Sequence, residues 1–337
     1  MNIEQLGEFG LIDRIQRALP VPGADVIVGI GDDVAVLRAI GTRVWLATCD
    51  VQVEGAHFLR EAIAPRDLGR KALAINLSDI AATGGTPRFA LVSLGLPGDL
   101  GVEFMDELYA GLRAEAEIFG VDIIGGNMAR SRLGIFIDVF LLGEAPRENV
   151  LLRSGARVGD KILVTGTLGD AAAGVALLTN RALTTTEAYA AMARSHRDTP
   201  TPRVREGQLI GAAHVATAML DVSDGLASDL SHICERSGVS ARVFAEHLPV
   251  ADENRLLARA AYGDERHFAL YGGEDYELLF TAPAAQANAL ADKITRETGT
   301  RVSIIGEILP KDARRELTLP DGRVIPLEAR GWDHFKT

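Results

Sequence analysis

Cysteine is nearly absent from this chain of 337 residues, which contains only Cys49 and Cys234. The two lie far apart and form no CxxC pair, so neither a disulfide framework nor a thiolate zinc site is expected. No apolar run approaches the roughly 20 residues of a membrane helix. The first 17 residues contain no basic segment followed by an apolar one, so we expect no signal peptide and a cytoplasmic location.

Basic residues are also in deficit, with 35 Lys and Arg against 46 Asp and Glu and a formal charge of −11. This balance argues against nucleic-acid or anionic-membrane partners, which need a positive surface. It permits a phosphorylated small molecule when cations mediate the contact. A hydrophobic content of 47% is enough for a large core, and the length is typical of about two domains.

Several common catalytic motifs are missing as well. The chain contains no GxxxxGK[ST], no GxSxG and no HExxH, which excludes a P-loop, a nucleophile elbow and a zincin site. Residues 29–34 follow an expected strand, but they lack the third glycine of a dinucleotide-binding turn. Two aspartates also stand where a pyrophosphate would approach, so the sequence gives little support to a dinucleotide-binding fold.

Strand-like and helix-like segments alternate, which predicts an α/β (α+β) fold with layers in both halves. A change of texture to Pro, Arg, Ser and Gly over residues 144–159 places the boundary between domains 1–147 and 148–337. The expected helices are 6–19, 65–83, 102–119, 170–178, 226–237, 253–261 and 284–298, and residues 180–202 are expected to be helix plus exposed connection. The expected strands are 25–30, 44–48, 89–96, 121–124, 135–143, 161–165, 216–220, 241–244, 276–281 and 302–308, with a hairpin over 317–326.

The most informative stretch is DVSDGL at residues 221–226, where a small apolar strand turns into a helix. Ser223 and Asp224 are good N-cap types for that helix. Similar carboxylates occur at 32–33, 50, 79 and 274–275, each beside glycine or at the end of a strand. Each one alone is ordinary turn chemistry, but together they suit a hard divalent cation such as Mg²⁺.

Phosphate could not meet these aspartates directly. Two like charges ~4 Å apart repel by about 1 kcal/mol in water and by about 4 kcal/mol at an effective dielectric near 20. Metal ions must therefore intervene, and the free N–H groups at the start of the 226–237 helix can also bind oxygens. This combination indicates phosphoryl transfer from a nucleotide, while the residues alone leave a calcium-binding or structural acidic site equally open.

The motifs of this chain also resemble those of a known protein family. The chain resembles thiamine-monophosphate kinases, in the larger group that includes aminoimidazole-ribonucleotide synthetase and selenophosphate synthetase. Eight motifs occur in the family's order, namely GEF at 7–9, GIGDD at 29–33, D50 with EGAHF at 54–58, KALAINLSDI at 71–80, RSGA at 153–156, DVSDGL at 221–226, GGEDYEL at 272–278 and GWDHF at 331–335.

The resemblance implies ATP-dependent phosphorylation of thiamine monophosphate to thiamine diphosphate, with ATP as co-substrate and several Mg²⁺ ions. It implies a homodimer whose N-terminal mixed sheets pair into a shared barrel, and a C-terminal α/β sandwich. The implied metal positions are Asp33, Thr48, Cys49, Asp50, Asp79, Asp221 and Asp224, of which Asp33, Asp79, Asp221 and Asp224 are also assigned to catalysis. The implied nucleotide contacts are Gly126, Asn127, Arg153 and Ser223, and the implied substrate contacts are His57, Glu274, Asp275 and Trp332.

Individual residues add to these expectations. Arg153 could supply a fixed positive charge to a triphosphate, and Trp332 could stack on a flat ring or close the core. Lys71 is interpreted as a solvated helix lysine. A requirement for K⁺ is left open.

Two residues depart from the family pattern. Asn127 stands where the family commonly has Asp, and a neutral amide is a weaker metal ligand. Cys49 replaces a hydroxyl residue, and only its carbonyl suits Mg²⁺. The alternatives are therefore a related ATP-dependent enzyme with another phosphorylated acceptor and a non-catalytic binder of thiamine phosphates.

Overall fold

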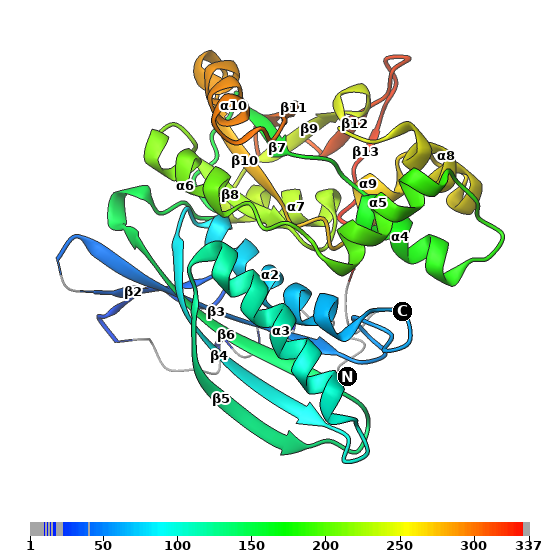
Figure 1. Cartoon of the computed structure of the whole chain (residues 1–337). Coiled ribbons are helices and arrows are strands. Elements are labelled where there is room, and N and C mark those ends of the chain that lie inside the picture. Colours follow the sequence, from blue (N-terminus) through cyan, green and yellow to red (C-terminus); the bar gives the residue numbers. More distant parts are fainter. Residues whose placement is uncertain are drawn as a thin grey trace.

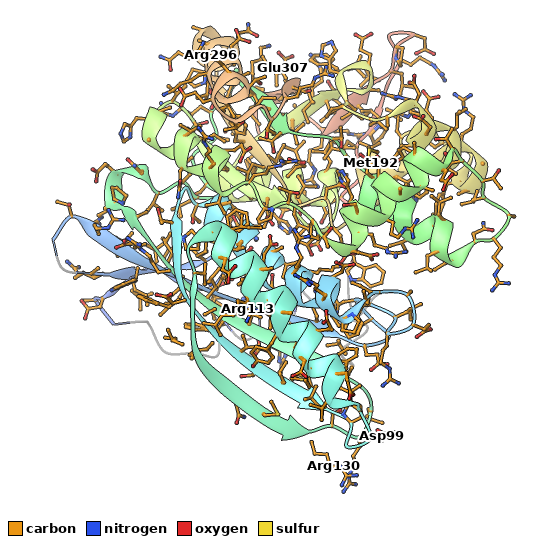
Figure 2. All side chains as sticks on the ribbon, in the orientation of Figure 1. Asp99, Arg113, Arg130, Met192, Arg296 and Glu307 are labelled. Carbon is orange, nitrogen blue, oxygen red and sulfur yellow. The ribbon has the colours of Figure 1, made fainter. Side chains whose placement is uncertain are left out.

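Two β-sheets and the helices packed on them form the molecule in this computed structural model, which describes residues 10, 12, 14, 16–17, 23–39 and 41–332. In Figure 1 the N-terminal sheet, coloured blue to green, lies below the C-terminal sheet, coloured green to red. Figure 2 places Asp99 and Arg130 at the lower tip of the N-terminal sheet and Arg296 and Glu307 at the opposite end of the molecule.

The N-terminal sheet has six strands in the order β1-β2-β3-β6-β4-β5. All neighbours in it are antiparallel except β4 and β5, which are parallel. The strands are β1 (Val26–Val28), β2 (Ala35–Arg38), β3 (Arg43–Val53), β4 (Thr86–Leu96), β5 (Asp122–Arg130) and β6 (Phe136–Pro146).

One face of this sheet is covered by α2 (Pro65–Ala82) and α3 (Val102–Phe119) (Figure 1). Pro65 opens α2 at the first turn, where its missing N–H costs nothing. Gly120 ends α3 in the left-handed conformation, with φ 66°. The two helices approach closely because Gly111 has no side chain: a Cβ there would lie 1.9 Å from the Arg66 carbonyl oxygen.

The C-terminal sheet has seven strands in the order β13-β12-β9-β11-β7-β10-β8. They are β7 (Asp160–Thr165), β8 (Ala218–Val222), β9 (Ser240–Phe244), β10 (Glu277–Pro283), β11 (Val302–Leu309), β12 (Glu316–Thr318) and β13 (Val324–Pro326). The helices of this half are α4 (Asp170–Thr179), α5 (Glu187–Asp198), α6 (Val204–Ala213), α7 (Leu226–Ser237), α8 (Asp252–Tyr262), α9 (His267–Tyr271) and α10 (Ala284–Thr298), with 3-10 turns η1 (Arg147–Asn149) and η2 (Ala245–His247).

The strands β7, β8 and β10 of the C-terminal sheet are buried on both faces, and their sequences are almost continuously apolar. Leu278 and Phe280 of β10 share a core with α10 and with the N-terminal sheet. Leu279, between them, points to the opposite face and packs with Leu226 and Leu230 of α7. The core that contains Leu278 and Phe280 therefore continues from one sheet to the other. Helix α2 lies between the two sheets and contacts β3 and β6 on one side and β8 on the other.

The predicted α/β (α+β) fold class is confirmed, and both sheets of the structure are mixed. The expected helices over 65–83, 102–119, 226–237 and 284–298 agree with α2, α3, α7 and α10 to within a residue. The N-terminal sheet is open within the described part of a single chain, so the shared barrel stays a prediction about two copies. In the residues that the structure describes, no helix is both long enough and apolar enough to span a bilayer.

The structure differs from the expected elements at several points. Residues 125–127 do not follow a strand but lie inside β5, where the parallel ladder with β4 continues to Arg130. Neither Ser223 nor Asp224 caps α7; the N-cap is Gly225, with no side-chain cap. Residues 180–202 contain the expected helix, α5, followed by a connection, but α6 at residues 204–213 was not expected. The predicted helix 6–19 lies largely outside the described residues, the motif at 7–9 lies wholly outside them, and so do the last three residues of the motif at 331–335.

Candidate active site

Three carboxylates from distant segments meet at the junction of the two sheets. Asp33 precedes β2, Asp79 lies on α2 and Asp221 on β8, and each offers an oxygen within 4.8 Å of those of the other two. Asp33 and Asp221 are buried, with 8% and 4% of their surface exposed, and Asp79 is half-buried. We call these three residues the acidic cluster.

Hydroxyl groups hold two of the three carboxylates. The Thr48 hydroxyl on β3 donates to Asp79 Oδ2 at 2.5 Å. The Ser78 hydroxyl on α2 donates to Asp221 Oδ2 at 2.6 Å. Beside them, the backbone N–H of Asp50 donates to Asn76 Oδ1 at 3.0 Å, which ties β3 to α2. The side chains of Asp79 and Asp221 are thus held by two hydroxyl groups of the N-terminal half, one on β3 and one on α2.

The electrostatics of the cluster disfavour its full ionisation. Burial, followed by the charge of Asp33, raises the pKa of Asp221 to about 7. Burial also raises the pKa of Asp79 well above its ordinary value, and the charges of Asp50, Asp221 and Asp33 add to it. Carboxylates are packed this closely where a cation or a shared proton compensates them.

Arg153 supplies part of that compensation. Its Nε donates to Asp33 Oδ1 at 2.8 Å, and its Nη2 contacts the same oxygen. Its backbone N–H donates to the Asp32 carboxylate at 3.3 Å. Asp33 Oδ2 is buried and has no hydrogen-bond partner in the described part of the chain. Such an orphaned acceptor is costly to bury, so it marks a place where a ligand fits.

A second group of possible ligands lies where β8 turns into α7. Asp224, Asp229 and His232 each offer one atom, and these atoms lie within 4.8 Å of one another. Asp229 Oδ2 also accepts the backbone N–H of Asp224 at 3.1 Å. The backbone N–H of Trp332 donates to the Asp224 carbonyl at 3.1 Å, which brings the C-terminal segment beside this turn, with Trp332 53% exposed.

The glycine-rich segment 272–276 packs against the same turn. Glu274 and Tyr276 have φ values of 70° and 51°, a left-handed conformation that is uncommon for such residues and typical of functional loops. Their backbone N–H groups donate to the carbonyls of Ser223 and Val222, both at 2.8 Å. A Cβ on Gly273 would lie 2.5 Å from the Ser223 carbonyl oxygen, so the close approach of the two segments requires glycine there.

The interpretation of Lys71 as a solvated lysine was wrong. Lys71 is 1% exposed, and its Nζ lies 2.6 Å from Glu274 Oε1. A lysine is almost never buried without a partner. The misreading arose because α2 is buried on nearly all sides, between two sheets, a placement that the sequence of the helix does not reveal.

Two further predicted substrate residues, Asp275 and His57, lie in different parts of the structure. The Asp275 carboxylate is buried and accepts the backbone N–H of Gly169, with N–O distances of 2.9 and 2.8 Å to its two oxygens. It therefore anchors the turn before α4. His57 lies in the loop after β3, and its Nδ1 accepts the Val53 N–H at 3.0 Å, which leaves the proton of the neutral ring on Nε2.

Three other predicted residues do not join the acidic cluster within one chain. Side chains alternate along β3, so the exposed Cys49 thiol points away from the face that carries Thr48 and Asp50. Gly126 and Asn127 lie on the edge strand β5, which β6 and β4 separate from β3. Three strand spacings amount to about 14 Å.

Sequence reasoning missed several residues of the site, namely Lys71, Ser78, Asp229 and His232. Ser78 could have been found, because it immediately precedes Asp79 on a helix that already carried a predicted ligand. Asp229 and His232 are three residues apart and therefore share a face of α7, but polar residues at this spacing are also typical of an ordinary amphipathic helix.

Comparison with known proteins identifies the chain's relatives. Residues 31–145 match the family described as AIR synthase related protein, N-terminal domain, and residues 157–316 match its C-terminal domain. The chain is 38% identical over 339 residues to the thiamine-monophosphate kinase of Aquifex aeolicus, covering 99% of this chain and 100% of the relative. The chain belongs to the thiamine-monophosphate kinase family.

Other relatives agree with this assignment. The thiamine-monophosphate kinase of Escherichia coli K12 is 37% identical, over 98% of this chain and 99% of its own. A solved structure described as AaThiL complexed with AMPPCP and TMP superposes with a TM-score of 0.83 at 36% identity, over 99% of both chains. The predicted membership of the thiamine-monophosphate kinase family is therefore confirmed.

Proposed function

We propose that this member of the thiamine-monophosphate kinase family phosphorylates thiamine monophosphate to thiamine diphosphate with ATP. The observation that carries the proposal is the convergence of Asp33, Asp79 and Asp221 beside Arg153. It stands in a chain that is similar, over nearly its full length, to curated thiamine-monophosphate kinases and to a structure with an ATP analogue and TMP.

The donor set fits Mg²⁺, which prefers oxygen ligands. The acidic cluster offers only carboxylate oxygens, and the buried Asp33 Oδ2 lacks a partner. Bound Mg²⁺ would neutralise the carboxylates and the phosphates, so that two anions can approach each other. The proposed ligands are Asp33, Thr48, the Cys49 carbonyl, Asp50, Asp79, Asp221 and Asp224.

The chain's own residues then have simple tasks. The acceptor is already a phosphate anion, so no strong general base is needed, and in-line positioning with charge stabilisation is sufficient. Arg153 provides a permanent cation beside the cluster, and Ser223 lies at the turn that leads into α7. His57, with its proton on Nε2, can donate to an acceptor phosphate.

We propose that Glu274 and Trp332 contact the acceptor's ring system. Glu274 lies in the strained segment packed on Ser223, and Trp332 is tied to Asp224 by its backbone. A flat cationic heterocycle matches a carboxylate and an exposed indole. Asp275, whose carboxylate is used by Gly169, would support this segment from behind without touching the acceptor.

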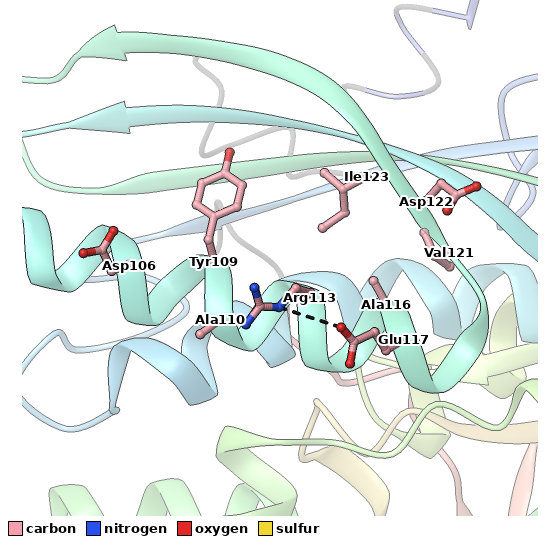
Figure 3. Close-up of a pocket in the computed structure, with 9 residues that line it drawn as sticks. All are labelled: Asp106, Tyr109, Ala110, Arg113, Ala116, Glu117, Val121, Asp122 and Ile123. Carbon is pink, nitrogen blue, oxygen red and sulfur yellow. Dashed lines mark ion pairs between the residues drawn. The ribbon is translucent and has the colours of Figure 1, made fainter.

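A homodimer is part of the proposal. The face of the N-terminal sheet opposite α2 and α3 bears large exposed apolar side chains, namely Trp45, Val51, Val53, Leu91 and Phe136, each 36–41% exposed. A second copy could cover them and bring its own Gly126 and Asn127 to this chain's cluster, which they cannot reach within one chain. Figure 3 shows a separate groove, between α3 and β5, that shares no residue with the cluster.

The proposal also assigns a boundary. We place residues up to 147 in a metal-binding and dimerisation domain and residues from 148 in the C-terminal domain. The shared core across the two sheets means that separated halves would expose apolar surface.

The deciding experiment follows product formation by purified protein with ATP, thiamine monophosphate and millimolar Mg²⁺. We expect ADP and thiamine diphosphate in equal amounts and no product with EDTA. Absence of product with enzyme in molar excess would reject the kinase.

One observation favours a second candidate, a non-catalytic binder of thiamine phosphates. Asn127 is a neutral amide in a position where the family commonly has Asp. Tight binding by calorimetry, with turnover only in Asn127→Asp, would support this candidate over the kinase. ADP release with a different phosphorylated acceptor would instead support a related enzyme.

A further inference from the structure

In the ion pair formed by Lys71 and Glu274, the lysine is buried and the glutamate is partly exposed to solvent. The Lys71 side chain is 2% exposed, whereas the Glu274 side chain is 25% exposed. Lys71 Nζ lies 2.6 Å from Glu274 Oε1. One carboxylate oxygen is therefore held from the interior of the molecule, while part of the side chain reaches the surface.

The backbone of Glu274 is fixed independently of this pair. Its left-handed φ of 70° is maintained by the hydrogen bond from its N–H to the Ser223 carbonyl, at 2.8 Å. The close contact of Gly273 with the same carbonyl prevents the segment from sliding. The backbone thus sets the position of Glu274, and Lys71 sets the direction of its carboxylate.

The spacing on α2 links this pair to the acidic cluster. Lys71 and Ser78 are seven residues apart, which is two helical turns on one face and about 10 Å along the axis. Ser78 holds Asp221 of β8, and Lys71 holds Glu274 of the segment before β10. One rigid helix of the N-terminal half therefore orients two carboxylates of the C-terminal half.

We propose that Lys71 is a positioning residue, which directs Glu274 toward the cationic, amino-bearing ring system of the phosphorylated acceptor. With Oε1 engaged by the Lys71 ammonium, Oε2 is left to accept a hydrogen bond from a ring amine or to face a ring cation. Without Lys71, the carboxylate could rotate about its side-chain bonds and would no longer be preorganised. This inference rests on the proposed function, because it assigns a role within the same site.

A purely structural pair is the competing explanation, since α2 and the 272–276 segment belong to different halves. The two explanations differ in what they change. A positioning role affects the apparent affinity for the acceptor and not that for ATP. A structural role lowers stability and affects both substrates together.

The test compares Lys71→Met, which keeps the length and removes the charge, with Lys71→Arg and Glu274→Gln. We expect Lys71→Met to raise KM for thiamine monophosphate at least tenfold and KM for ATP less than threefold, with partial rescue in Lys71→Arg. In the Glu274→Gln background, Lys71→Met should add less than a twofold change, because both act through one carboxylate. Lys161→Met is the matched control, since it breaks a Lys–Glu pair of 3.0 Å with Glu307, far from the site.

The inference is overturned if folded Lys71→Met keeps the wild-type KM for thiamine monophosphate, if both KM values rise equally, or if the two substitutions are additive. Should Lys71→Met not fold, the same comparison between Lys71→Gln and Lys71→Arg decides. A wild-type protein without kinase activity would reject the proposed function separately. In that case, the calorimetric affinity of wild type and Lys71→Met for thiamine monophosphate decides the role of Lys71: a tenfold loss supports it and an unchanged affinity overturns it.

Discussion

The Ser78 hydroxyl donates to Asp221 Oδ2 at 2.6 Å and joins α2, packed on the N-terminal sheet, to β8 of the C-terminal sheet. Both groups are buried. Asp221 therefore keeps one orientation without a ligand, and its other oxygen remains available to the acidic cluster. This contact makes α2 the element that assembles the site from both halves.

Asp221→Asn should reduce Mg²⁺-dependent turnover by about 10²–10³-fold, the loss expected when a preorganised electrostatic partner is removed. Ser78→Ala should have a smaller effect, because it loosens the carboxylate without removing it. Steady-state rates over a Mg²⁺ titration measure both. Asp221→Asn with more than a tenth of wild-type activity would show that Asp221 does not hold the metal.

Arg153→Met should destabilise the protein in the absence of metal, because it leaves the buried Asp33 carboxylate without its ion-pair partner. Breaking such a buried pair typically costs about 3–5 kcal/mol, the upper limit here because Arg153 is partly exposed. Urea unfolding measures the loss, and we expect millimolar Mg²⁺ to restore part of it. Arg43→Met, which removes one of two arginines from Glu144 on the sheet surface, is the control and should cost less than about 1 kcal/mol.

Gly111→Ala should destabilise the fold by about 1–3 kcal/mol, the usual cost of overpacking. Its new Cβ would meet the Arg66 backbone at 1.9 Å, so α2 and α3 would have to separate. Denaturant midpoints, with the exposed Glu117→Gln on the same helix as control, measure the effect. An unchanged midpoint would mean that the helices are not in close contact.

The two thiols should react very differently. Cys49 is exposed and Cys234 is buried, and burial raises the pKa of the Cys234 thiol to about 12. At pH 8 we expect iodoacetamide to spare Cys234 in the folded protein and to modify both cysteines after unfolding, whereas Cys49, on the sheet face that we propose a second copy covers, should react only in the monomer. Mass spectrometry of wild type, Cys49→Ser and Cys234→Ser identifies the sites. Rapid labelling of Cys234 in the native protein would contradict the placement of α7.

The raised pKa of the Cys234 thiol also makes the stability of the folded protein depend on pH. An unfolded thiol ionises near its ordinary pKa of 9, whereas the folded Cys234 stays protonated to about pH 12. The folded state binds more protons in this window, so its stability should fall as the pH rises above 9. Cys234→Ala should show a shallower decline than wild type in urea unfolding at pH 8 and pH 10.

The sequence alone determined the layered α/β fold and the positions of many helices. Proline at the start of α2, glycine after α3 and α7, and apolar periodicity are local signals, and the structure agrees with them. The ordered motifs also determined the family, because glycine-bounded turns and acidic residues can be identified directly in the sequence.

Only the tertiary structure decided which of these residues meet. Asp33, Asp79 and Asp221 lie up to 188 positions apart in the printed sequence, and their convergence follows from the packing of α2 between two sheets. The same packing buried Lys71 on Glu274 and kept Asn127 three strands away from β3. The burial of a side chain and its distance from residues far along the chain depend on how the two sheets pack, so no local sequence pattern could have predicted them.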